Sequence, residues 1–265
     1  MMKRYLFFIF LLLAKLHAAA QEPIRDNSFL VEEAYNQDAG VVQHIFTGQF
    51  DPAFKNADGS FTQEWPAGSM LHQVSYTLPY RFYDGINFSL NDMLINYRYQ
   101  LLAKDNLFIS PRCSFIIPTG QSQSTENTGG TGFQLVVPFS FELCNKISMH
   151  VNIGNSFTWY DAQKKETRLN KTEEFSSGLS FIYYITNNLN IMLETVHISD
   201  FYKYDSRPDV LETKTIINPG FRFAINFPSG LQIVPGIAAP FDLQTKSSSC
   251  YLYLSFEHPL KKKKS

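Results

Sequence analysis

Apolar and polar side chains alternate along most of the chain with a period of two residues. In residues 147–160, ISMHVNIGNSFTWY, the odd positions are apolar apart from Asn155, and the even positions up to Thr158 are small or polar. Successive side chains of a β-strand point to opposite faces, so this pattern predicts a strand with one apolar and one polar face. The alternation returns, each time over about the ~10 residues of a tilted membrane strand, in residues 92–101, 107–117, 133–143, 175–183 and 217–227.

Roughly twelve segments of this kind are predicted. An even number of strands allows a closed barrel with both ends of the chain on one side of a membrane. The segments are residues 41–50, 59–66, 71–81, 91–101, 106–118, 131–144, 146–160, 172–185, 189–199, 214–227, 230–240 and 249–258.

The lengths of the links between these segments alternate between short and long along the chain. The links after even-numbered segments are short, such as TNN and PSG, whereas most links after odd-numbered segments are long and polar, such as DFYKYDSRPDVLET at residues 200–213. The link around FYDGINFSLN is ambiguous. Outer-membrane barrels have short periplasmic turns and longer external loops, and a soluble sandwich has no reason to sort its loops in this way.

A bilayer explains both faces of the segments. Strands survive in hydrocarbon only when every backbone group is paired, which requires a closed barrel without edges. The sequence therefore predicts an all-β protein, a single transmembrane antiparallel up-and-down barrel of about 12 strands with apolar faces toward lipid and polar faces toward the lumen. Aromatic residues near the predicted strand ends fit interfacial girdles: Trp65, Phe82, Tyr83, Trp159 and Tyr160.

The first twenty residues have the organisation of a secretory signal peptide. Lys3 and Arg4 precede an apolar run, and small residues end the stretch at Ala18 to Ala20. We therefore expect export, cleavage near Gln21 and a location in the outer membrane. The predicted organisation is a signal peptide (1–20), a periplasmic N-terminal segment that is either a plug or a tether (21–39), the barrel (40–260) and a basic tail (261–265).

Composition narrows the function classes. The formal net charge is −1 and the pI is about 6.6, so there is no basic excess for nucleic acid, and no apolar run after residue 20 approaches the length of a membrane helix. The 24 Phe and 14 Tyr are a heavy aromatic load, consistent with a lipid-facing surface. His44, His72 and His258 lie in separate predicted strands, so we expect no metal and no cofactor.

Three stretches carry a resemblance to a known family. They are SFLVEEAYNQDAGVVQHIF (28–46), FIIPTG (115–120) and NPGFRFAINFPSGLQIVPGIAAPF (218–241), and they resemble the outer-membrane barrels grouped as the MetA-pathway of phenol degradation, or transporter-like, family. The resemblance implies a barrel of about this size with a role in the uptake of small, often aromatic, compounds. Such barrels commonly end on an aromatic residue that the barrel assembly machinery reads, whereas this chain ends SFEHPLKKKKS. Phe256 is the candidate for that signal, ahead of the basic tail.

Charged and polar residues of both signs fall on the predicted inner face. Two interpretations stay open: a polar path whose charges select solutes, or ion pairs that plug a narrow barrel. SFLVEEAYNQ (28–37), with Glu32 and Glu33, can enter the periplasmic mouth or serve as a plain tether. The candidate lumen residues are Asp92, Arg98, Arg112, Glu142, His150, Asn152, Glu194, Lys214 and Arg222.

The leading hypothesis is a channel that passes small solutes by passive diffusion, as a monomer in outer-membrane lipid. The alternatives are a structural or partner-binding barrel with a plugged lumen, or a lipid-modifying enzyme. For the enzyme, His197 and Ser199 form an H-x-S arrangement similar to that of lipid A deacylase barrels. An irregular alternation between Leu193 and Val196 leaves the face of this pair open.

Overall fold

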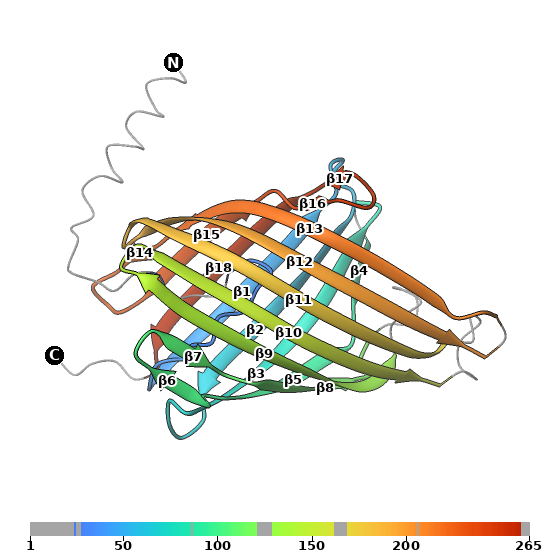
Figure 1. Cartoon of the computed structure of the whole chain (residues 1–265), viewed down its shortest axis with the longest axis horizontal. Coiled ribbons are helices and arrows are strands. Elements are labelled where there is room, and N and C mark those ends of the chain that lie inside the picture. Colours follow the sequence, from blue (N-terminus) through green and yellow to red (C-terminus); the bar gives the residue numbers. More distant parts are fainter. Residues whose placement is uncertain are drawn as a thin grey trace, which may run out of the picture.

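The chain closes into one antiparallel β-barrel in the computed structural model (Figure 1). The structure describes residue 24 and residues 28–85, 87–120, 129–161, 169–205 and 207–260. The predicted signal peptide (1–20) and basic tail (261–265) lie outside the described residues.

The barrel has twelve strands, as the sequence predicts, built from shorter and longer elements. Seven barrel strands are single elements: β1 (Val41–Phe50), β2 (Ala57–Pro66), β3 (His72–Tyr83), β9 (Gly130–Cys144), β10 (Ile147–Tyr160), β11 (Leu169–Thr186) and β12 (Leu189–Tyr204). Five are interrupted: β4 (Asn87–Leu90) with β5 (Met93–Tyr99) and β6 (Leu102–Lys104), β7 (Leu107–Ile109) with β8 (Arg112–Ile117), β13 (Val210–Phe223) with β14 (Ile225–Asn226), β15 (Gln232–Ala238) with β16 (Phe241–Asp242), and β17 (Ser247–Ser248) with β18 (Cys250–Pro259).

Closure comes from the first and last strands. β1 pairs with β2 on one side and with β18 on the other, from Val41 opposite Pro259 to Phe50 opposite Cys250. Successive barrel strands pair in chain order, which gives the up-and-down topology. We call the end with the short turns the periplasmic end and the other the extracellular end, following the usual orientation of such barrels.

No helix in the described part of the chain is long and apolar enough to cross a membrane.

One of the expected extracellular loops is shorter than the sequence suggested. β12 runs on to Tyr204 and pairs with β13 up to Tyr202 opposite Val210, so most of residues 200–213 is strand rather than loop. Phe201 and Tyr202 favour strand, and pairing satisfies their backbone groups in spite of the polar neighbours. The ambiguous link after β3 is a tight turn in which Asp84 and Gly85 both have positive φ.

The outer surface of the barrel is apolar and carries aromatic clusters. Phe115 is 65% exposed, and Phe133, Phe157 and Trp159 form one ring cluster near the extracellular end. The Lys171 ammonium lies 4.7 Å from the Phe157 ring centroid, as expected where a lysine reaches from an apolar surface toward water. The girdle prediction is wrong for Tyr160, which is only 8% exposed because it falls on the inward positions of β10.

Residues 28–37, here called the N-terminal segment, lie inside the barrel. Ser28, Val31, Glu33 and Ala34 are almost fully buried. Phe29 packs in an apolar cluster with wall side chains that include Tyr251 and Tyr253. The core of this barrel is therefore made in part by a stretch of chain that belongs to none of its strands (Figure 1).

Candidate functional site

Wall side chains bind the backbone of the N-terminal segment. The segment has no regular secondary structure, so its buried N–H and C=O groups need other partners. Leu30 N–H and Val31 N–H donate to Glu194 Oε1 at 3.0 and 3.1 Å, Ala34 N–H to Ser140 Oγ at 2.7 Å, Asn36 N–H to Gln100 Oε1 at 3.1 Å and Gln37 N–H to Gln73 Oε1 at 2.7 Å. The inner wall thus takes the place of a neighbouring strand.

The segment's carbonyl groups are bound in the same way. Tyr251 Oη donates to the Phe29 carbonyl at 2.8 Å. Gln100 Nε2 and Ser110 Oγ donate to the Ala34 carbonyl at 3.0 and 2.8 Å. Donors and acceptors therefore come from several barrel strands, which fixes the path of the segment across the lumen.

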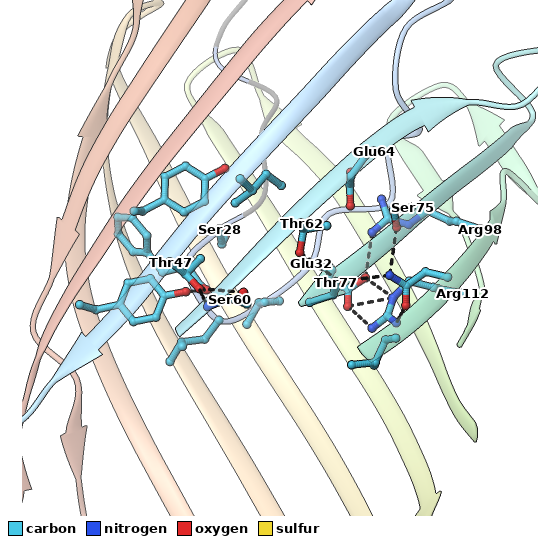
Figure 2. A pocket seen from close by; sticks show the side chains of 18 residues that line it. Ser28, Glu32, Thr47, Ser60, Thr62, Glu64, Ser75, Thr77, Arg98 and Arg112 are labelled. Atoms are coloured by element: carbon cyan, nitrogen blue, oxygen red, sulfur yellow. Dashed lines mark hydrogen bonds and ion pairs between the residues drawn. The ribbon is translucent and has the colours of Figure 1, made fainter. Parts of the chain in front are cut away.

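One side chain of the segment forms ion pairs with two wall arginines. Figure 2 shows the Glu32 carboxylate between Arg98 of β5 and Arg112 of β8. Arg98 Nη2 donates to Glu32 Oε2 at 2.8 Å, and Arg112 Nε donates to both carboxylate oxygens at 3.1 and 3.0 Å. The side chains of Arg98 and Arg112 are 3% and 13% exposed, and that of Glu32 is 24% exposed.

The wall itself orients Arg112. Its Nη1 donates to Asn96 Oδ1 at 3.2 Å and to Ser114 Oγ, and its Nη2 donates to Gln134 Oε1 at 3.0 Å. These three acceptors are neutral, so they position the guanidinium without cancelling its charge. The negative charge in contact with Arg112 comes from Glu32.

The arginines also determine the protonation of Glu32, which belongs to the segment and not to a membrane strand. Burial raises the pKa of the Glu32 carboxyl, but the charges of Arg112 and Arg98 and their hydrogen bonds outweigh burial and hold the pKa at about 2, against an ordinary value of 4.5. Glu32 is therefore a carboxylate at neutral pH.

Small residues let the segment approach the wall on β11 and β13. A Cβ on Gly178 would lie 2.9 Å from Val31 Cγ2, and a Cβ on Gly220 would lie 2.4 Å from Phe29 Cε2. Both distances are shorter than side chains tolerate, so glycine is required at these positions for the observed packing.

At least five of the nine predicted lumen residues contact the segment. Besides Arg98, Arg112 and Glu194, Glu142 accepts a hydrogen bond from Tyr35 Oη at 3.4 Å, and His150 meets the Tyr35 ring edge-on at 6.0 Å between centroids.

The remaining predicted lumen residues are Asp92, Asn152, Lys214 and Arg222. Asp92 accepts hydrogen bonds from the N–H groups of Gly120, Gly129 and Gly130, so it braces the chain near the extracellular end. Lys214 is exposed and lines a cavity at that end. Asn152 stands half-buried opposite Gly178, and Arg222 is fully buried.

Sequence reasoning missed the neutral residues that bind the segment's backbone. Gln100 and Ser140 stand on the polar face of their strands, so alternation placed them inside, but nothing in their chemistry marked them out. The same holds for Ser180, whose hydroxyl lies 2.9 Å from that of Ser28.

Cavities lie along the lumen between the described residues. The first, of about 250 Å³, lies between the segment and the wall formed by β1, β2, β3, β5, β8 and β18 (Figure 2). The second, of about 620 Å³, is at the extracellular end and is lined by loop residues together with Lys214 and Asp242.

The H-x-S pair lies on the outer face. The alternation of β12 is regular, with Leu193 outward and Glu194 inward, so His197 and Ser199 face outward. Ser199 Oγ lies 3.2 Å from His197 Nε2, as a nucleophile and its base would. His197 Nδ1, however, lies 3.0 Å from the hydroxyl of Thr215, where a catalytic triad has a carboxylate.

Within the described residues, no group of three or more His, Cys, Asp and Glu side chains is placed to hold a metal ion.

Comparisons with known proteins identify the fold. No family model and no curated protein matches the chain. The NanC porin is similar in structure, with a TM-score of 0.55 and 10% sequence identity, over 82% of this chain and 100% of that one. An outer membrane channel from Pseudomonas putida F1 has a TM-score of 0.57 and 11% identity, over 85% of this chain and 97% of that one. The chain has the fold of outer-membrane channel barrels, and its resemblance to the MetA-pathway family stays a prediction.

Proposed function

We propose that this protein is an outer-membrane channel for small solutes in which the N-terminal segment is a removable plug. The observation that carries the proposal is how the segment is held: polar wall side chains bind its backbone, as in the bonds from Leu30 and Val31 to Glu194. Such partners can be replaced by water when the segment leaves, whereas an apolar core cannot be hydrated at low cost.

The rest of the interior supports a path for polar solutes. Inward positions of the wall carry hydroxyl, amide and charged groups, and the extracellular end has a cavity of about 620 Å³ that can serve as a vestibule. The folds of the NanC porin and the Pseudomonas putida channel are consistent with this role. Passage is by passive diffusion, and the resemblance noted in the sequence adds small aromatic compounds to the candidate solutes.

Localisation follows from the same proposal. The chain is exported through its signal peptide, cleaved near Gln21 and inserted in the outer membrane as a monomer by the barrel assembly machinery. The even apolar surface of the barrel offers lipid contacts around its circumference.

Solute-driven swelling of liposomes that carry the refolded chain from Gln21 tests the proposal. The key variant is Gly178→Leu, whose side chain takes the space of Val31 and so displaces the segment without substituting any residue of the ion pairs. The matched control is Gly154→Leu, at an inward position that meets Ser176 and Val136 of the wall instead. We expect faster swelling with sugars, amino acids and aromatic acids for Gly178→Leu than for the unchanged chain and the control. A folded Gly178→Leu barrel that behaves like empty liposomes would refute the channel.

A further inference from the structure

The two arginines form a site that is larger than its present occupant. Glu32 fills only the point where Arg98 and Arg112 converge, and the cavity of about 250 Å³ begins beside it (Figure 2). At about 30 Å³ for each water molecule, this cavity has the volume of roughly eight waters, which suits a small solute.

The cavity wall next to the arginines is lined with hydroxyl groups. Thr47 and Ser60 hydroxyls lie 2.9 Å apart, and Thr62 and Thr77 hydroxyls lie 3.0 Å apart, across neighbouring strands. A hydroxyl can donate one hydrogen bond and accept others, so each pair keeps capacity for a further polar partner. This lining favours a ligand that carries hydroxyl groups of its own.

Charge determines which group goes to the arginine end. If the Glu32 side chain moves away, Arg112 keeps its neutral partners Asn96, Ser114 and Gln134 and therefore its orientation, but it loses the carboxylate that balances its charge. A buried guanidinium without a counter-charge is costly, and its planar fork matches a carboxylate in two-point contact. The vacated position thus selects another carboxylate.

We infer that Arg98 and Arg112 form a binding site for the carboxylate of a small hydroxylated solute, and that Glu32 occupies this site while the channel is closed. The inference rests on the proposed function and gives the solute class. Solute and Glu32 compete for the same donors, so the solute loosens the segment and the seated segment weakens solute binding to the same extent.

Equilibrium binding to the refolded chain in detergent micelles tests this without any flux measurement. The probes are three six-carbon compounds: gluconate, with a carboxylate and hydroxyls, sorbitol, with hydroxyls alone, and hexanoate, with a carboxylate alone. We expect gluconate to bind Glu32→Ala about tenfold or more tightly than the unchanged chain, since removal of the competitor is equivalent to about 1.4 kcal/mol or more. Sorbitol and hexanoate should bind Glu32→Ala at least about tenfold more weakly than gluconate does.

Two further variants locate the site. Arg112→Gln and, separately, Arg98→Gln in the Glu32→Ala chain should each weaken gluconate binding, with circular dichroism to show that the barrel is folded. Equal binding of sorbitol or hexanoate, or folded arginine variants with unchanged gluconate affinity, would overturn the inference. Gluconate binding without any swelling would reject the channel and support the binding site. Swelling of Gly178→Leu without gluconate binding would support the channel and reject the binding site.

Discussion

The barrel wall holds the N-terminal segment by charge on one side and by packing on another. On the arginine side, formed by Arg98 of β5 and Arg112 of β8, the contacts are mainly charged, and a cavity lies next to them. Glu32 pairs with both guanidinium groups, and Glu33 Oε1 lies 3.8 Å from Arg98 Nη1. On the glycine side, formed by β11 to β13, Gly178 and Gly220 let the segment lie directly against the wall.

This difference indicates which side of the segment can detach from the wall first. An ion pair is replaceable by an ion from solution, and its strength depends on pH and salt. Close packing and backbone hydrogen bonds, such as those from Leu30 and Val31 to Glu194, are replaced only when the whole stretch moves. Opening should therefore begin at the arginine side and end at the glycine side.

The largest expected effect comes from locking the glycine side. Ser28 Oγ and Ser180 Oγ lie 2.9 Å apart, close enough that cysteines at both positions can form a disulfide with a small adjustment. In a chain with the native cysteines replaced by alanine and Glu32→Ala added, oxidation of Ser28→Cys/Ser180→Cys should abolish solute-driven swelling, and a reductant should restore it. A crosslink verified by mass spectrometry that leaves swelling unchanged would show that the segment does not control passage.

Removing the charge contact is the next largest change. Glu32→Ala leaves Arg112 without its counter-charge in the closed state. Because Glu32 is partly exposed, the loss destabilises the closed state by about 1.5 kcal/mol, less than the loss of a fully buried ion pair would. The ratio of open to closed barrels should then rise about tenfold, measured as swelling rate or as conductance in planar bilayers. The matched control is Glu142→Ala, which removes another lumen carboxylate whose bond to Tyr35 is long, 3.4 Å. Equal responses of the two variants would count against a special role for the arginine side.

The fold was predictable because a membrane imposes its rules on the sequence. Lipid on one face and a polar lumen on the other force the period of two, so alternation assigns Arg98 and Arg112 to the inner face, and both contact Glu32. Beyond the bilayer, strands need not alternate between apolar and polar residues. Residues 200–213 therefore looked like a loop, although β12 and β13 pair up to Tyr202.

The occupied lumen was less predictable. Glu32 pairs with residues 66 and 80 positions away, and the N-terminal segment has no period from which its course follows. Its contacts are also mostly with neutral side chains such as Gln100 and Ser140, whose types do not reveal a partner. The apparent irregularity at Val196 has the same origin, since this inward apolar residue lies close to Gly178 and Val31.

The pH dependence of conductance tests the contribution of the ion pairs on the arginine side. The folded pKa of Glu32 lies below its ordinary value, at about 2 against 4.5, because Arg112 and Arg98 outweigh burial. The ion pairs therefore stabilise the closed state fully above pH 4.5, and this contribution is lost as the pH falls from 4.5 toward about 2. The part of the conductance that depends on Glu32, measured as the difference between the unchanged chain and Glu32→Ala, should be constant from neutral pH down to about 5 and change only in more acidic solution. A change in this difference at milder pH would mean that another group controls opening.

The smallest effect should come from the hydroxyl pair on the glycine side. Ser28→Ala or Ser180→Ala removes one neutral hydrogen bond worth about 1 kcal/mol, so the open fraction should rise about fivefold at most. The two changes break the same bond, so the double variant should open no more than either single variant, because removing both partners leaves no unsatisfied hydroxyl. Swelling rates of the four chains give this cycle directly. If the increases in open fraction from the two single variants multiply in the double variant, the two serines act through different contacts. The glycine side would then consist of weaker, separable contacts.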